Sequence, residues 1–131
     1  MANNYLQSRH IGLVGALMAL LAVALGAFGA HGLAPRLSPG DLATFETAVR
    51  YQMYHALGLI LLAAQSASAP DFRARVPAWA FTIGIVVFSG SLYVLVLTGE
   101  RWLGAVTPLG GVAFLVGWGT LAWGYLRRDH A

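Results

Sequence analysis

The sequence predicts an all-α integral membrane protein, an up-and-down bundle of four transmembrane helices. Of the 131 residues, 58% are hydrophobic and only 10% are charged, whereas soluble domains carry about 25% charged residues. The mean hydropathy of +0.68 agrees. A hydrocarbon core about 30 Å thick takes about 20 helical residues, and four segments meet this requirement: residues 11–30, 51–67, 78–98 and 106–126. We expect a single membrane domain over residues 1–131, because nothing remains over for a soluble domain.

The charged residues and the absence of cysteine exclude several classes of function. All eight basic side chains are arginines, so a lysine Schiff base cannot form. The arginines are scattered rather than gathered into a basic patch, and we therefore expect no nucleic-acid partner. Without cysteine the chain has no disulfide, no thiolate metal ligand and no cysteine nucleophile.

The arginines also predict how the segments are oriented. Arg9 precedes the first apolar segment as it would in a signal peptide, but the segment is longer than the 7 to 15 residues of a signal core.

Five arginines lie on one side of the predicted membrane and three on the other: Arg9, Arg73, Arg75, Arg127 and Arg128 against Arg36, Arg50 and Arg101. Because the more basic side faces the cytoplasm, we expect both termini there.

The second segment is predicted to continue a helix that begins outside the membrane. Ser38 is a typical N-cap, Pro39 suits the first helical position, and Asp41 lies in the first turn. A helix over residues 39–66 would be about 42 Å long, more than a span requires. We therefore expect an interfacial helical extension before the second span.

Small residues recur at a seven-residue period along the first and last segments. Such residues let helix backbones approach closely in lipid, and this period suits neighbours that cross at about +20°. The helix-packing candidates are Gly12, Gly15, Ala19, Ala22, Gly26 and Gly29 in the first stripe and Gly110, Ala113, Gly117, Thr120 and Gly124 in the second. Glycine is frequent in membrane helices anyway. Whether the stripes face each other or a second protomer stays open.

Polar residues gather toward the non-cytoplasmic half of the predicted bundle. Glu46 and Arg50 have the i,i+4 order that favours an ion pair. Tyr51 and His55 follow one turn apart, with Gln52 beside them, on a face that we expect to point into the bundle. The candidate polar cluster or binding site is His31, Glu46, Arg50, Tyr51, Gln52, His55, Ser91, Tyr93 and Thr107.

Several interpretations of this cluster are open. In a structural network, the side chains form hydrogen bonds between helices, which contribute about 0.6 kcal/mol each. In a binding or translocation site, His55 would titrate and Arg50 would hold an anion or a lipid headgroup. A metal site of His31, His55 and Glu46 is disfavoured, because there is neither HExxH spacing nor cysteine. No GxSxG motif supports hydrolysis, so we expect no metal, no cofactor and no enzyme activity.

Three stretches resemble a known family: "GAFGAHGL" at 26–33, "FETAVRYQMYHALGL" at 45–59, and "FSGSLY" followed by "TPLGG" within 88–111. They are similar to the YgdD-like small membrane proteins, the domain of unknown function 423, which occur in bacteria and have a small animal transmembrane relative. The likeness covers essentially the whole chain. It implies a four-span membrane protein and carries no activity to transfer. Its motifs mark Gly29, His31, Gly32, Glu46, Arg50, Tyr51, His55, Gly90, Ser91 and Pro108 as positions to test.

The residues and the resemblance together predict a multi-pass protein of the bacterial inner (plasma) membrane. The favoured function is a non-enzymatic structural or assembly component. Its partners would be the lipid bilayer and either further copies of the chain or another membrane protein. The alternative is a carrier or sensor of a small solute, lipid or proton that uses the polar cluster. A chain of 131 residues has little room for alternating gates, so this alternative predicts an oligomer.

Overall fold

Helices account for most of the structure, a computed structural model that describes residues 2–69 and 71–127. Arg128, which counts toward the predicted orientation, lies outside the described residues. The elements in chain order are α1 (Ala2–Phe28), the π-helical turn η1 (Gly29–Leu33), α2 (Pro39–Ser68), α3 (Arg75–Gly84), the π-helical turn η2 (Ile85–Ser89), α4 (Gly90–Thr98), the 3₁₀ turn η3 (Arg101–Ala105) and α5 (Thr107–Leu126).

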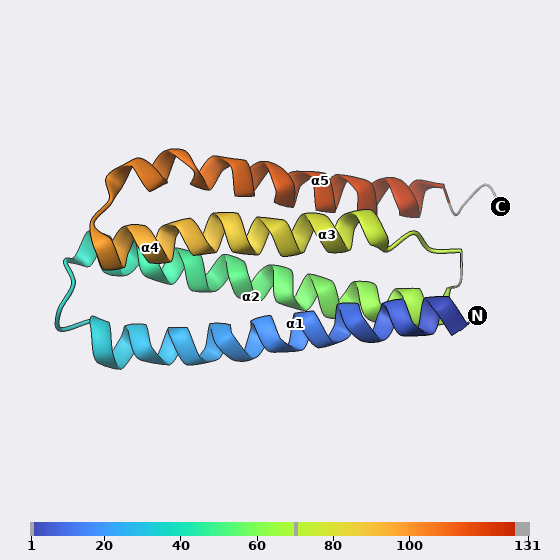
Figure 1. The fold of residues 1–131 in the computed structure, drawn as a ribbon, viewed down its shortest axis with the longest axis horizontal. Coiled ribbons are helices and arrows are strands. Elements are labelled where there is room, and N and C mark those ends of the chain that lie inside the picture. The colour runs from blue at the N-terminus through green and yellow to red at the C-terminus, as the bar shows by residue number, and fades with distance from the viewer. Residues whose placement is uncertain (1, 70, 128–131) are drawn as a thin grey trace.

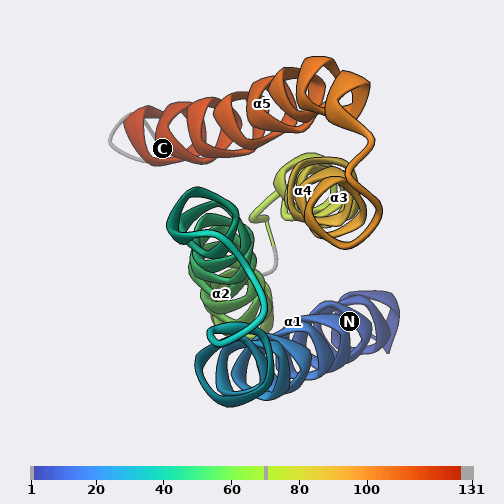
Figure 2. The same cartoon turned by 90° about the vertical axis from the view of Figure 1, so that its left-hand side faces the viewer.

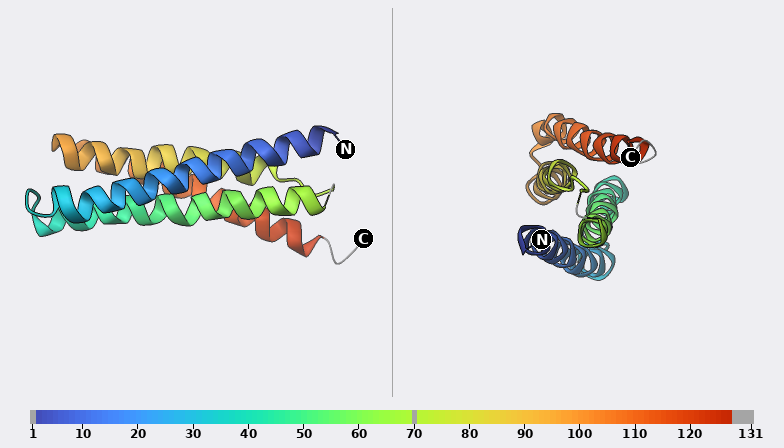
Figure 3. Two further views of the ribbon diagram at one scale, coloured as in Figure 1. Left: turned by 90° about the horizontal axis from the view of Figure 1, so that it is seen from below. Right: turned by 90° about the vertical axis from the view of Figure 1, so that its right-hand side faces the viewer.

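The helices run up and down as predicted. α1 continues directly into η1, and α3, η2 and α4 form one continuous rod, so the described chain makes four long rods (Figure 1). The N-terminal start of α1 and the C-terminal end of α5 lie at the same end of the molecule (Figure 3). We call this end the terminal end and the opposite one the loop end.

The predicted start of the second helix is confirmed. The Ser38 hydroxyl accepts a hydrogen bond from the Asp41 N–H at 3.1 Å, and Pro39 occupies the first turn. The third rod begins at Arg75, three residues before the predicted span, and ends where Gly99 adopts φ 77°. This left-handed conformation is one that glycine adopts without strain.

The rods pack mainly in chain order rather than as a ring. α1 packs chiefly on α2, α2 packs on α3, η2 and α4, and α5 packs on α3 and η2. Seen along the rods, α1 and α5 lie on opposite sides of the molecule, with α2 and the α3–α4 rod between them (Figure 2). α2 is therefore a central helix, although it is not the most apolar one.

Both stripes of small residues lie at contacts within the chain. In the first stripe, a Cβ at Gly15 would come within 2.9 Å of the Ala56 carbonyl oxygen, and a Cβ at Gly29 would come within 3.0 Å of the Phe45 ring. Ala22, in the same stripe, is 1% exposed. This stripe of α1 and η1 therefore lets the first rod approach α2 closely.

The second stripe receives the α3–η2 rod. A Cβ at Gly110 would lie 2.4 Å from the backbone nitrogen of Phe88, and a Cβ at Gly117 would lie 2.4 Å from the Phe81 ring. The reverse fit also occurs, because a Cβ at Gly84 of α3 would lie 2.4 Å from the Phe114 ring of α5. Each helix thus inserts an aromatic ring over a glycine of the other.

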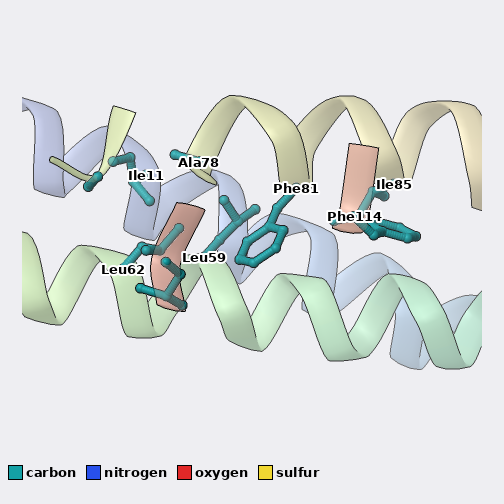
Figure 4. Packing of buried hydrophobic residues seen from close by; sticks show 9 residues of the cluster. Ile11, Leu59, Leu62, Ala78, Phe81, Ile85 and Phe114 are labelled. Carbon is teal, nitrogen blue, oxygen red and sulfur yellow. The ribbon is translucent and has the colours of Figure 1, made fainter. Parts of the chain in front are cut away.

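A continuous apolar core fills the space between α2, α3 and α5 near the terminal end. Figure 4 shows the Phe81 and Phe114 side chains pointing into this core beside Leu59 and Ile85. A second cluster near the loop end consists of Leu33, Phe45, Leu95 and Val96. Between the clusters lie the polar groups of the candidate site.

Three helices of the described chain are long and apolar enough to cross a membrane: Gln7–Leu33, Arg75–Thr98 and Arg101–Leu126. α2 is not among them. Its N-terminal half carries Glu46, Arg50, Gln52 and His55, so its apolar run is short. The all-helical architecture is therefore confirmed, while residues 51–67 do not meet the same test.

Candidate functional site

Gln52 links three helices through its side-chain amide. It projects from α2 and is 3% exposed. Its Nε2 donates to the Met18 carbonyl oxygen of α1 at 2.9 Å, and its Oε1 accepts from the Tyr93 hydroxyl of α4 at 2.7 Å. The Met18 carbonyl can only accept, which fixes the orientation of the amide. Both the donor and the acceptor of the Gln52 amide are thus hydrogen-bonded, which offsets the free-energy cost of burying this polar group.

His55 lies one turn further along α2 and is 4% exposed. Its Nε2 accepts a hydrogen bond from the Trp118 indole of α5 at 3.0 Å, and its Nδ1 lies 2.6 Å from the Tyr51 carbonyl oxygen. The indole N–H can only donate, so Nε2 carries the lone pair and Nδ1 carries the proton. The geometry therefore describes a neutral imidazole with both nitrogens engaged.

Aromatic rings enclose this imidazole. The Phe114 ring is stacked on it, with centroids 3.5 Å apart and planes at 8°. Phe81 meets it edge-on with centroids 5.4 Å apart. Tyr51 stacks on Phe88 of η2 at 4.7 Å. These apolar neighbours disfavour a charged imidazolium, so the surroundings agree with the neutral form.

Hydroxyl groups make further links between helices. Ser89 of η2 is fully buried and donates to the Ala48 carbonyl oxygen of α2 at 2.7 Å. The hydroxyl oxygens of Ser91 and Thr107 lie 2.7 Å apart and join α4 to the start of α5. The buried polar side chains in this half of the described bundle are thus each paired with a neighbouring helix.

The predicted polar series does not form one cluster. His31, Glu46 and Arg50 are exposed, and Tyr51 is 37% exposed. Helical geometry explains the division, because Glu46 and His55 are nine residues apart, a rotation that places them about 180° apart around α2. The buried groups are Gln52, His55 and Ser91, with Tyr93 and Thr107 partly buried.

The expected ion pair between Glu46 and Arg50 is not formed in the part of the chain that the structure describes. Arg101 instead forms a bidentate pair with Asp41 across 60 residues, with Nη1 3.0 Å from Oδ1 and Nη2 3.3 Å from Oδ2. This hydrogen bond from Arg101 lowers the pKa of the Asp41 carboxyl. The pair joins the first turn of α2 to η3 at the loop end.

Sequence reasoning missed three partners in this network: Ser89, Trp118 and the Met18 carbonyl. Ser89 stands two residues before Ser91 in "FSGSLY". Trp118 lies in the middle of an apolar segment, whereas tryptophan is enriched at membrane interfaces. This unusual position was the feature of the sequence that could have identified Trp118. No feature of the sequence distinguishes the Met18 carbonyl from its neighbours.

A recess adjoins the His55 network on the side of α2 and α5. Its volume is about 380 Å³, and it is lined by Tyr51, Tyr54, His55, Gly111, Phe114, Leu115 and Trp118. Among the described residues, no group of three His, Cys, Asp or Glu side chains is placed to hold a metal ion. The arrangement as a whole is an internal hydrogen-bond network between helices, bordered by aromatic rings.

Comparison with known proteins gives a family for the chain. The family described as "Protein of unknown function (DUF423)" matches residues 25–111. A UPF0382 membrane protein of Staphylococcus saprophyticus is 49% identical over 115 residues, which are 88% of this chain and 95% of that protein. The UPF0382 membrane protein YwdK of Bacillus subtilis is 50% identical over 107 residues, 81% of this chain and 87% of that protein. No solved structure matches the chain. The chain is thus similar over most of its length to proteins named as membrane proteins, and it belongs to the DUF423 family.

Proposed function

We propose that the protein is a non-enzymatic component of the bacterial plasma membrane whose internal polar groups hold its helices together and whose outer faces assemble with a partner. The observation that carries this proposal is the pairing of the Gln52 amide with α1 and α4 at the same time. A side chain committed at both ends to neighbouring helices serves as an interhelical link rather than as a free binding group. The partner would be a further copy of the chain or another membrane protein.

We also propose that all four rods cross the membrane. α2 has 30 residues and a length of about 45 Å, enough for a hydrocarbon core of about 30 Å. It runs beside α1 and the α3–α4 rod over their length (Figure 1). Its polar residues Gln52 and His55 are buried between helices, so a central helix of this kind need not be as apolar as one that faces lipid.

The terminal end is proposed to face the cytoplasm. Arg9, Arg73, Arg75 and Arg127 lie at or near this end, whereas Arg36, Arg50 and Arg101 lie in the half of the molecule toward the loop end. The excess of arginine favours the cytoplasmic side for the terminal end. Exposed Trp79 and Trp123 are consistent with an interface at that end.

The alternative, a carrier or sensor, receives support from one feature, the recess beside His55. The roles that this alternative gives to His55 and Arg50 fit the observed contacts of these residues less well. Both nitrogens of His55 already have partners, and Arg50 is exposed on the side of α2 away from His55. A proton or solute path through His55 would first have to break the Trp118 contact.

Cysteine labelling separates these alternatives, because the chain has no cysteine of its own. A thiol at Ser89→Cys would replace a fully buried hydroxyl, and Ser68→Cys would place the same group at an exposed helix end. We expect a small maleimide to label Ser68→Cys and to leave Ser89→Cys unlabelled in native membranes. Rapid labelling of Ser89→Cys would indicate a water-filled path and would contradict the closed-network proposal.

The four-span topology is tested with an impermeant maleimide on whole cells. Pro35→Cys and Glu100→Cys lie in the two loop-end connections, and Asp71→Cys lies in the connection between α2 and α3. We expect the first two to react from outside and Asp71→Cys to react only after permeabilisation. Any other pattern would refute four crossings with cytoplasmic termini.

Assembly is tested by native mass spectrometry after gentle extraction from the native membrane. A complex of defined mass is expected for the wild-type chain. A bare monomer under conditions that preserve known membrane complexes would contradict the assembly role. A bare monomer would not contradict the closed network, because that part of the proposal is tested separately by labelling of Ser89→Cys.

A further inference from the structure

A groove lies between α1 and α3 on the outside of the bundle near the terminal end. Its volume is about 540 Å³, within the range of about 300 to 1,000 Å³ typical of small-molecule sites. Buried Leu59 of α2 lines it together with Ile11 and Ala78, which Figure 4 shows in the same region of the core. The complete lining is Gln7, His10, Ile11, Val14, Leu59, Arg75, Ala78, Trp79 and Thr82.

The groove changes from a charged and polar rim to a mainly apolar interior, where the hydroxyl of Thr82 donates to the Ala78 carbonyl oxygen of its own helix at 2.8 Å. Its outermost lining residues are Gln7 and His10 of α1 and Arg75 of α3, which begin these two walls. One turn further in, Val14 and Ala78 present only apolar side chains. The seven residues from Gln7 to Val14 correspond to about 10 Å along the helix axis. A matching ligand therefore has a polar head at the rim and an apolar tail directed toward the middle of the bundle.

The charge at the rim is positive. Arg73 stands two residues before Arg75, and Arg9 precedes the lining residue His10 on α1, whereas Asp71 is the acidic residue of the described α2–α3 connection. The Arg75 side chain is exposed and has no ion-pair or hydrogen-bond partner among residues 7–69 and 71–127. Trp79, which is 61% exposed, forms part of the wall, and its position is typical of the headgroup region.

We propose that this groove binds one anionic phospholipid of the surrounding bilayer. Arg75 would contact the phosphate, and the start of one acyl chain would lie along Ile11, Val14 and Ala78. Basic pockets between membrane helices suit anionic headgroups, and a guanidinium is well matched to phosphate oxygens. The site lies outside the internal network, so this inference goes beyond the proposed function and does not depend on the assembly role.

The charge also argues against a second copy of the chain as the occupant. A parallel copy that covered this groove would bring its own terminal-end arginines close to Arg9, Arg73 and Arg75. Such like charges repel at short range. An anionic lipid instead neutralises the rim while its tail covers the apolar wall.

The test uses the full-length protein with equal amounts of phosphatidylglycerol and phosphatidylcholine, followed by native mass spectrometry. We expect the wild-type chain to retain one phosphatidylglycerol in preference to phosphatidylcholine. Arg75→Gln should lower phosphatidylglycerol retention about fivefold, the change expected for one basic residue near anionic lipid. Arg36→Gln, at another exposed arginine near the loop end, is the matched control and should retain the lipid as the wild type does.

A second pair of variants tests the apolar wall without changing charge. Val14→Phe fills the groove, whereas Val23→Phe makes the same change at a position on α1 that is 63% exposed. We expect only Val14→Phe to lose the bound lipid. Absence of headgroup preference in the wild type, or equal effects within either pair, would overturn the proposal. A dimer that carries no lipid would also overturn it, because the groove of the assembled protein would then hold no phospholipid.

Discussion

The indole N–H of Trp118 on α5 donates a hydrogen bond to Nε2 of His55 on α2 over 3.0 Å. This contact connects two helices through residues that are 63 positions apart in sequence. It also sets the histidine tautomer, because the second nitrogen must then donate to the Tyr51 carbonyl. A histidine that the sequence suggests as a proton carrier is thereby held as a neutral interhelical link.

Loss of the indole donor should weaken this link. We expect Trp118→Phe to lower the free energy of unfolding by about 1 kcal/mol, because the buried Nε2 of His55 loses its partner. Unfolding in mixed micelles by added dodecyl sulfate measures the change. Trp123→Phe is the control, since Trp123 is 58% exposed and stacks on Arg127 instead. Equal effects of the two changes would contradict a specific role for Trp118.

The Gln52 and Tyr93 side chains should be energetically coupled. Single replacements Gln52→Met and Tyr93→Phe each remove the 2.7 Å hydrogen bond. In a double-mutant cycle we expect a coupling energy of about 0.6 kcal/mol, with an upper bound of about 1.7 kcal/mol for such bonds in membranes. Tyr54→Phe, at an exposed tyrosine, should show no coupling to Gln52→Met. Strict additivity in the first cycle would refute the link.

Two glycines of α5 should respond in opposite ways to alanine. A Cβ at Gly110 would lie 2.4 Å from the Phe88 backbone nitrogen, whereas a Cβ at Gly119 has nothing within 4 Å. We expect Gly110→Ala to destabilise by about 1 to 3 kcal/mol through overpacking. Gly119→Ala should stabilise by up to about 1 kcal/mol through helix propensity. The same unfolding assay compares them, and similar values for both would show that α5 does not approach η2 this closely.

The ion pair between Asp41 and Arg101 should make stability depend on pH at the loop end. The Arg101 hydrogen bond lowers the pKa of Asp41 in the folded state. Its contribution is therefore fully present above the unfolded pKa of about 3.9 and is lost as the pH falls through the lower folded value. We expect a small fall in Tm below about pH 4 that is reduced in Asp41→Asn.

Glu46→Gln provides the control for this pH dependence, because Glu46 is exposed and unpaired among the described residues. Its acid profile should follow that of the wild type. Arg101→Gln should reduce the same pH dependence as Asp41→Asn, since either change removes the pair. If Arg101→Gln leaves the profile unchanged, Asp41 acts without Arg101 and the assignment is wrong.

Local features of the fold were predictable because they depend on nearby residues. The N-cap at Ser38 follows from hydroxyl and proline placement. The two rods at the chain ends follow from apolar length. The stripes of small residues indicated where backbones approach, although the partner helix of each stripe was not specified. The two π-helical turns were not predicted, since no local residue pattern requires them.

The candidate site shows the same division. Helical geometry by itself separates Glu46 from His55 around α2, so the polar residues of α2 could not all belong to one cluster. It does not say which side faces the neighbouring helices. Packing decided that Gln52 and His55 are buried and that Arg50 is exposed. A polar group is buried only where another helix supplies its partner.

The sequence by itself determined an apolar, all-helical membrane protein, the start of its second helix and the residues that permit close packing. Tertiary structure alone decided the partners: Trp118 for His55, Tyr93 and Met18 for Gln52, and Arg101 for Asp41. The physical reason is range. Helix propensity, capping and hydropathy act over a few residues, whereas these contacts join groups 34 to 63 residues apart and depend on how whole helices pack.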